Sequence, residues 1–317
     1  MENPLLTESP LPYGAPQFDK IENKHYMPAF EQGIKEAKAE IDAIVANPAE
    51  PTFENTIQAL EESGRTLNNV ASIFYNILEA DTNEELQAIA EKISPMMTEY
   101  SMYVSLNEPL FQKVKAVYEK RDGMDLDPDQ AKLLEDTFKG FARGGANLSP
   151  EDKEKYSKIE EELSLVQLTF GNNVLAATNA YTLNITDEAD LAGLPDFVKD
   201  QGKAAAAEKG VDGWVFDLSY PSYSPFMQYS TNRELRRQMY MAYNTKAVGG
   251  EFDNLENTRK IVDLRIQSAN LLGYGTYADY ALEDRMAKDK ATVNSFLAEL
   301  LAPSVPAAKA EVEAIYR

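Results

Sequence analysis

Apolar residues recur at helical spacing along most of this 317-residue chain, and this periodicity restricts its fold more than any other feature. The clearest run lies in residues 28–46, where apolar side chains alternate at intervals of four and three residues until Asn47-Pro48 ends the pattern. Further helical patterns follow Thr52, Asp127, Ser149 and Asn254. Because such spacing gives each helix an apolar stripe that must pack against another element, the sequence predicts a mostly α-helical protein.

Several of these helices carry a recognisable start signal. Asp127-Pro128 places a capping oxygen before a proline in the first turn. Thr82-x-x-Glu85 and Thr231-x-x-Glu234 have the spacing of a capping box, so we expect Thr82 and Thr231 to be N-caps. Gly64 should bend the helical stretch that follows Thr52.

The apolar period changes from helical to two between about residues 180 and 220. Residues 181–185 and 214–218 alternate apolar and polar side chains, which predicts two short strands separated by a helix that begins at Pro195. We therefore divide the chain into four segments. These are an extended, proline-rich N-terminal segment (1–22), a helical region (23–179), a small strand-containing insert (180–220) and a second helical region (221–317).

The scarcity of cysteine and histidine excludes several kinds of chemistry. The chain has no cysteine, so it can form no disulfide, thiolate nucleophile or cysteine-based zinc site. Its one histidine, His25, cannot supply the two imidazoles that most catalytic zinc sites need. Since His25 lies beside the first helix start, we interpret it as a surface or capping residue rather than a catalytic base.

The net charge of −21 argues against two classes of partner. The acidic excess lies in residues 1–230, whereas residues 231–317 are balanced. An acidic surface repels phosphate backbones and anionic lipids, so we expect neither nucleic acid nor membrane as a partner. Solvated helix faces that keep the protein soluble are the simpler explanation of the charge itself. No secretory signal is visible at the start, which favours the cytoplasm, or the periplasm if a leader was removed.

Two weaker patterns receive structural interpretations. Gly273-x-Gly275-x-x-Ala278 fits a loose dinucleotide fingerprint, but a helical pattern precedes it where that fingerprint requires a strand. We interpret it as a helix end followed by a tight turn. Glu160-Glu161-Glu162 lies within a long helix, where we expect a solvated face with partners four residues away.

Tyrosines and arginines gather between residues 220 and 243. Phenol hydroxyls and guanidinium groups suit a peptide carbonyl or carboxylate, although packing would also explain the cluster. The candidates for contact with a substrate are Tyr220, Tyr223, Arg233, Arg236, Tyr240 and Tyr243.

Five blocks of the sequence, in order, resemble a known family. Residues 51–64 (PTFENTIQALEESG), 191–195 (LAGLP), 232–242 and 271–287 resemble the thimet oligopeptidase family of zinc metallopeptidases. Residues 16–21 (PQFDKI) are similar to its peptidyl-dipeptidase (dipeptidyl carboxypeptidase) branch. Each block is moderately specific by itself, but five in the correct order make a strong resemblance that covers almost the whole chain.

The resemblance implies a mostly α fold. The chain would form a multi-helix lobe of a two-lobed, neurolysin-like metallopeptidase with a channel between the lobes and a small β-hairpin-like insert near 180–220. It also implies a monomeric, zinc-dependent hydrolase of short peptides, which in this branch releases dipeptides from a free C-terminus. The chemistry needs His-Glu-x-x-His on a helix, with both imidazoles on zinc and the glutamate activating the metal-bound water.

No His-Glu-x-x-His motif occurs in this chain. In the family the zinc helix follows the block that begins at Leu271, and the helical pattern at residues 310–317 has no stop signal. We therefore expect the N-terminal portion of a longer enzyme, which forms channel wall, holds no catalytic or zinc-binding residue and is inactive alone. Two alternatives stay open: a fragment of an oligopeptidase A-like endopeptidase, and a non-catalytic helical peptide-binding or scaffold protein.

Overall fold

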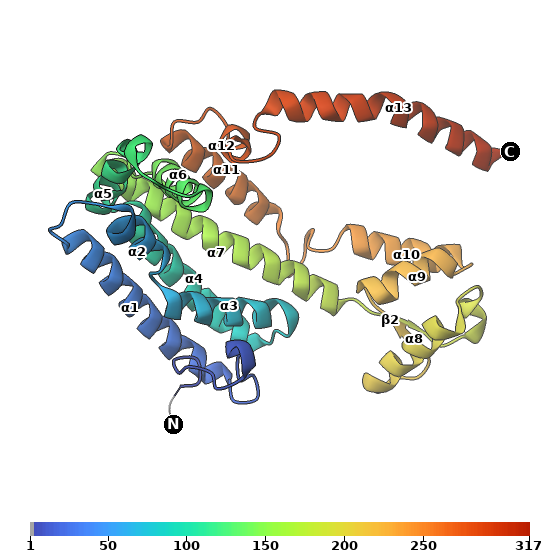
Figure 1. Cartoon of the computed structure of the whole chain (residues 1–317). Coiled ribbons are helices and arrows are strands. Elements are labelled where there is room, and N and C mark those ends of the chain that lie inside the picture. Colours follow the sequence, from blue (N-terminus) through green and yellow to red (C-terminus); the bar gives the residue numbers. More distant parts are fainter. Residues whose placement is uncertain (1–2) are drawn as a thin grey trace. The chain divides into compact units, whose positions relative to one another are not determined.

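The computed structural model describes residues 3–317, which divide into two compact units (Figure 1). Unit 1 comprises the residues up to Ser164 together with Val262–Arg317, and unit 2 comprises Leu165–Ile261. Helices α7 (Pro150–Ala180) and α11 (Leu255–Leu271) contribute to both units. Most described residues are helical, and one small antiparallel sheet is present in this part of the chain, as the sequence predicted.

Unit 1 is built mainly from helices. They are α1 (Tyr26–Ala46), α2 (Ala59–Glu61), α3 (Arg65–Ala80), α4 (Glu84–Ser105), α5 (Glu108–Glu119), α6 (Pro128–Arg143), α12 (Tyr277–Glu283) and α13 (Lys290–Tyr316). Short 3₁₀ segments lie at Pro12–Gly14, Asn23–His25 and Arg121–Gly123, and a π-helical turn occupies Phe53–Gln58. Gly64 separates α2 from α3 with a φ of 69°, which explains the predicted bend.

The core of unit 1 is built around α1, which packs against α3, α4 and α5. The predicted stripe of α1 is buried along its whole length. Phe74 of α3 lies at ring-centroid distances of 5.0 Å from Tyr26 and 5.5 Å from Phe30. A Cβ atom at Gly33 would lie 3.0 Å from the Cα of Leu67, so the glycine permits α1 and α3 to approach closely.

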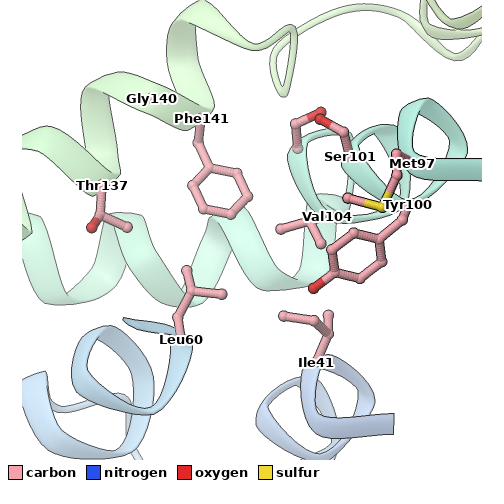
Figure 2. A pocket seen from close by; sticks show the side chains of 10 residues that line it. Ile41, Leu60, Met97, Tyr100, Ser101, Val104, Thr137, Gly140 and Phe141 are labelled. Atoms are coloured by element: carbon pink, nitrogen blue, oxygen red, sulfur yellow. The ribbon is translucent and has the colours of Figure 1, made fainter. Parts of the chain in front are cut away.

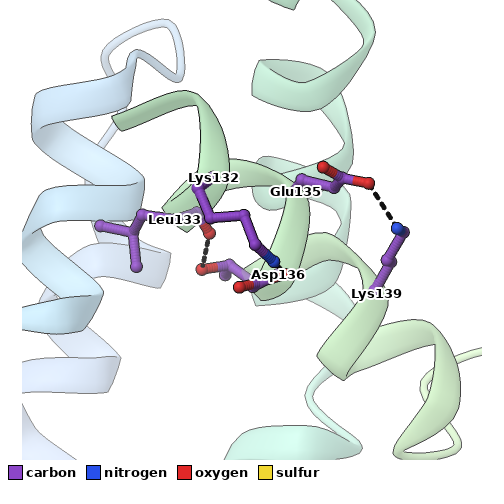
Figure 3. Close-up of polar contacts among 6 residues, drawn as sticks. Lys132, Leu133, Glu135, Asp136 and Lys139 are labelled. Carbon is purple, nitrogen blue, oxygen red and sulfur yellow. Dashed lines mark hydrogen bonds and ion pairs between the residues drawn. The ribbon is translucent and has the colours of Figure 1, made fainter. Parts of the chain in front are cut away.

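The exposed face of α6 carries ion pairs between residues one helical turn apart. Lys132 pairs with Asp136, and Lys139 pairs with Glu135, each four residues apart (Figure 3). Asp127 caps this helix as predicted, since its side chain accepts a hydrogen bond of 2.8 Å from the amide of Gln130. Pairs of this kind on exposed faces contribute little to stability but keep the face solvated.

The two threonine caps predicted from capping-box spacing are wrong by one residue. Asn83 caps α4 by accepting from the amide of Leu86 at 3.0 Å, while the buried hydroxyl of Thr82 has no hydrogen-bond partner. Asn232 caps α10 (Arg233–Asn244), and Thr231 instead donates to the carbonyl of Ala192 at 3.0 Å. In both pairs an asparagine follows the threonine, and asparagine is at least as good an N-cap.

Unit 2 contains the sheet and the helices packed on it. Its further elements are β1 (Leu183–Ile185), a 3₁₀ turn (Glu188–Leu191), α8 (Asp196–Glu208), β2 (Trp214–Phe216), α9 (Tyr220–Tyr229) and α10 (Arg233–Asn244). The strands pair antiparallel with Leu183 opposite Phe216. The helix α8 lies between them in sequence and follows Pro195, as predicted. Phe216 and Phe226 pack at a centroid distance of 4.8 Å in the core of this unit.

Candidate functional site

The six residues predicted to contact a substrate all lie on α9 and α10 of unit 2. Tyr223 and Tyr243 stack at a centroid distance of 4.1 Å, and the ammonium group of Lys246 lies 4.1 Å from the centre of the Tyr243 ring. Burial, with smaller contributions from Tyr243 and Tyr240, raises the pKa of Tyr223 above its usual range. Like any tyrosine at neutral pH, this phenol is protonated and can donate a hydrogen bond.

The remaining predicted residues divide into one that is anchored and three that are exposed. Arg236 donates a hydrogen bond of 2.6 Å to the carbonyl of Ser230, which joins the start of α10 to the end of α9. Tyr220, Tyr240 and Arg233 lie on the surface of the unit. The sequence cluster thus becomes a stacked tyrosine pair, a structural arginine and three groups that are free to meet a ligand. Contact between any of them and a substrate remains a prediction.

A second polar cluster, in unit 1, was not predicted from the sequence. Arg143 of α6 pairs with Glu283 of α12, donates to the carbonyl of Tyr280 at 2.9 Å, and places its guanidinium 4.7 Å from the centre of the Tyr280 ring. Tyr274 donates to the same Glu283 carboxylate at 2.5 Å. Burial first, and then the hydrogen bond and charge of Glu283, raise the pKa of Tyr274 to about 12.

The same cluster continues onto α7 and α11. The hydroxyl of Ser268 donates to Glu160 at 2.7 Å, so the expectation of a solvated face is wrong for Glu160, which the turn of α7 directs toward α11. Glu161 and Glu162 are exposed, as expected. Burial raises the pKa of the neighbouring Tyr156 far above its usual range. The guanidinium of Arg265 lies 5.1 Å from the centre of the Tyr277 ring. These contacts fasten α11 and α12 to the rest of unit 1.

An apolar cavity of about 460 Å³ opens between α1, α2, α4 and α6 of unit 1 (Figure 2). Its lining is Ile41, Leu60, Met97, Tyr100, Ser101, Val104, Ser105, Thr137, Gly140 and Phe141. Burial and the charge of Glu40 raise the pKa of Tyr100 above its usual range. The lining holds no charged side chain and no nucleophile with an adjacent base, so the cavity can accept an apolar group but offers no catalytic machinery.

The described residues do not fit a zinc site. Within residues 3–317 no group of three or more histidine, cysteine, aspartate or glutamate side chains is placed to hold a metal ion. The ring nitrogen Nδ1 of His25 accepts a hydrogen bond of 2.9 Å from the amide of Glu22, which makes it a capping residue, as predicted. In the same part of the chain no helix is long and apolar enough to cross a membrane.

Comparison with known proteins identifies the family. Residues 226–317 match the model described as Peptidase family M3. The chain is also 37% identical over 312 residues to the dipeptidyl carboxypeptidase of Escherichia coli (strain K12), an alignment that covers 97% of this chain and 45% of that relative. The chain is similar to peptidases of family M3. The resemblance to zinc metallopeptidases seen in its sequence blocks is therefore confirmed at the level of the family.

Other relatives extend this result. Oligopeptidase A of Escherichia coli (strain K12) is 34% identical over 98% of this chain and 46% of its own length. The thimet-like oligopeptidase of Dictyostelium discoideum is 27% identical over 90% of this chain and 41% of its own length. The chain thus spans less than half the length of the curated relatives that it matches.

Proposed function

We propose that this chain is the N-terminal portion of a zinc-dependent peptidyl-dipeptidase, which releases dipeptides from the C-terminus of short peptides. The observation that carries the proposal is the 37% identity to a dipeptidyl carboxypeptidase across 97% of the chain. In this proposal the described residues form part of the wall of the substrate channel and supply no catalytic group. The enzyme acts in the cytoplasm as a monomer.

In this proposal the zinc ligands come from a part of the full-length enzyme beyond these residues, since no group of three potential ligand side chains is placed to hold a metal ion among the described residues. In an enzyme of this kind zinc polarises the scissile carbonyl and lowers the pKa of water. The described residues are left with binding and positioning. Tyr220, Tyr240 and Arg233 are exposed donors, which suit the carbonyls of a peptide and its terminal carboxylate.

The full-length protein should be tested beside the 317-residue chain on an N-acetylated pentapeptide with a free C-terminus. We expect the full-length protein to bind zinc and to release the C-terminal dipeptide, detected by mass spectrometry. The 317-residue chain should release nothing. Peptide cleavage by the 317-residue chain, or loss of single residues from either end, would contradict the proposal.

The identity of 34% to oligopeptidase A supports a second candidate, an endopeptidase of the same family. The same pentapeptide with a C-terminal amide separates the two. A peptidyl-dipeptidase that requires the terminal carboxylate should lose most of its activity on the amide. An endopeptidase should cut both peptides at the same internal bond and at similar rates.

A further inference from the structure

The C-terminal helix α13 (Lys290–Tyr316) exposes apolar side chains along its whole length. None of its residues is buried, although Leu301 is 62% exposed and Ile315 is 83% exposed. The other large apolar side chains exposed on it are Phe296, Leu297, Leu300, Val305, Val312 and Tyr316. An apolar surface of this extent marks a site of contact with another element.

The distribution of side chains around α13 indicates enclosure rather than contact on one face. Residues 291–308 contain a single charged side chain, Glu299. At 3.6 residues per turn the large apolar side chains cover roughly half the circumference, wider than the stripe of roughly 100° that suits a helix packed on one surface. Within residues 291–308 the opposite half holds mainly small residues such as Ala302, which allow a second element to approach, together with Glu299. Lys309 and Glu313 continue this half toward the end of the helix.

Two internal prolines add an independent argument. Pro303 and Pro306 lie inside α13 and cannot donate the backbone hydrogen bonds that the preceding turn would accept. A helix that lacks these bonds and packs on nothing has little to stabilise it in water, because helices in proteins derive most of their stability from tertiary packing. The helix therefore needs surrounding structure in order to persist.

We infer that α13 is enclosed, on both its large-residue and its small-residue sides, by the remaining half of a full-length M3 peptidase. The inference rests on the proposed function. The relatives are more than twice as long as this chain, and the M3 match covers the whole of α13. A second copy of the chain is a poorer occupant, because a symmetric contact would cover only one side of each helix.

Thiol reactivity provides the test, because the chain has no cysteine of its own. Leu301→Cys probes the large-residue side, Ala302→Cys probes the small-residue side, and Glu154→Cys on α7, whose side chain is 71% exposed, is the control. Val305→Cys replaces the first variant if that one misfolds. Each is made in the 317-residue chain and in the full-length protein, whose unsubstituted form gives the background.

We expect all three thiols to react at comparable rates in the 317-residue chain. In the full-length protein both α13 thiols should slow by at least about a hundredfold, while the control thiol stays within about threefold. Undiminished reactivity of α13 in the full-length protein would overturn the inference, as would protection of only one side, protection by self-association of the 317-residue chain, or a gene that encodes nothing further.

The peptide assay on the same samples separates this inference from the proposed function. Full-length protein that releases dipeptides while its α13 thiols remain reactive would overturn the enclosure and leave the function standing. Full-length protein that protects both thiols but cleaves no peptide would support the enclosure and overturn the function.

Discussion

Helices α1 and α13 both lie in unit 1 and both carry regular apolar patterns, yet their surroundings are opposite. The apolar stripe of α1 is buried against α3, α4 and α5, whereas no residue of α13 is buried. Apolar periodicity therefore predicts that a segment is helical and needs a partner, but not whether the partner lies in the same chain. Substitutions in each helix test this difference in surroundings.

The largest loss of stability should come from removing the ring of Phe74 in α3, which packs against α1. Phe74→Ala removes a fully buried ring from between Tyr26 and Phe30, and should lower the free energy of unfolding by about 3–5 kcal/mol. Leu301→Ala on α13 is the control and should change it by less than about 0.5 kcal/mol in the 317-residue chain. Urea denaturation measures both changes in the free energy of unfolding. Equal losses for the two variants would contradict the difference between α1 and α13.

A smaller effect is expected where α1 and α3 approach closely. Gly33→Ala places a Cβ atom 3.0 Å from the backbone of Leu67 and should cost about 1–3 kcal/mol. The matched variant Gly140→Ala on α6 meets no atom within 4 Å and should stabilise the protein by about 0.5–1 kcal/mol. Thermal unfolding should move the two midpoints in opposite directions. A shift in the same direction for both would show that the α1 interface is looser than described.

In unit 2 the comparison becomes one between two exposed arginines of α10, of which only Arg233 is proposed to contact the substrate. In the full-length enzyme Arg233→Ala should raise KM by about tenfold with unchanged kcat, since it removes an interaction made equally in ground and transition states. Arg237→Ala, whose side chain is 67% exposed and ion-paired on the same helix, is the control. Steady-state kinetics with the free-acid pentapeptide give kcat and KM for both variants. Equal changes in KM would remove Arg233 from the substrate contacts.

The weakest expected effect concerns the hydrogen bond between Tyr274 and Glu283 of α12. The pKa of Tyr274 is raised to about 12 from an ordinary value of 10, so the folded protein keeps a proton that the unfolded chain releases first. This contribution is complete below pH 10 and is lost as the pH rises toward 12. Tyr274→Phe should therefore flatten the fall in unfolding free energy across that window, measured by urea denaturation at several pH values. An unchanged slope would contradict the assignment.

The sequence predicted most elements because each depends on local patterns. The stripe of α1, the capping of α6 by Asp127 and the two strands all follow from spacing within a few residues. The caps at Asn83 and Asn232 were missed because two residues able to cap stand side by side, and spacing alone does not choose between them.

The sites were less predictable because they depend on distant contacts. Arg143 and Glu283 are 140 residues apart in sequence, and no local pattern links them. Proximity in sequence grouped Arg233 with Arg236, but the turn between α9 and α10 directs only Arg236 to a backbone carbonyl. The exposure of α13 was not predicted either, since its sequence reads as that of a buried helix.

The zinc content of the 317-residue chain and of the full-length protein tests the central claim most directly. Both are purified, dialysed against the same trace of zinc and analysed by native mass spectrometry. The account predicts about one tightly held zinc ion per full-length molecule and none in the chain, whose single histidine and absent cysteine leave no ligand set. One zinc ion held tightly by the chain alone would contradict it.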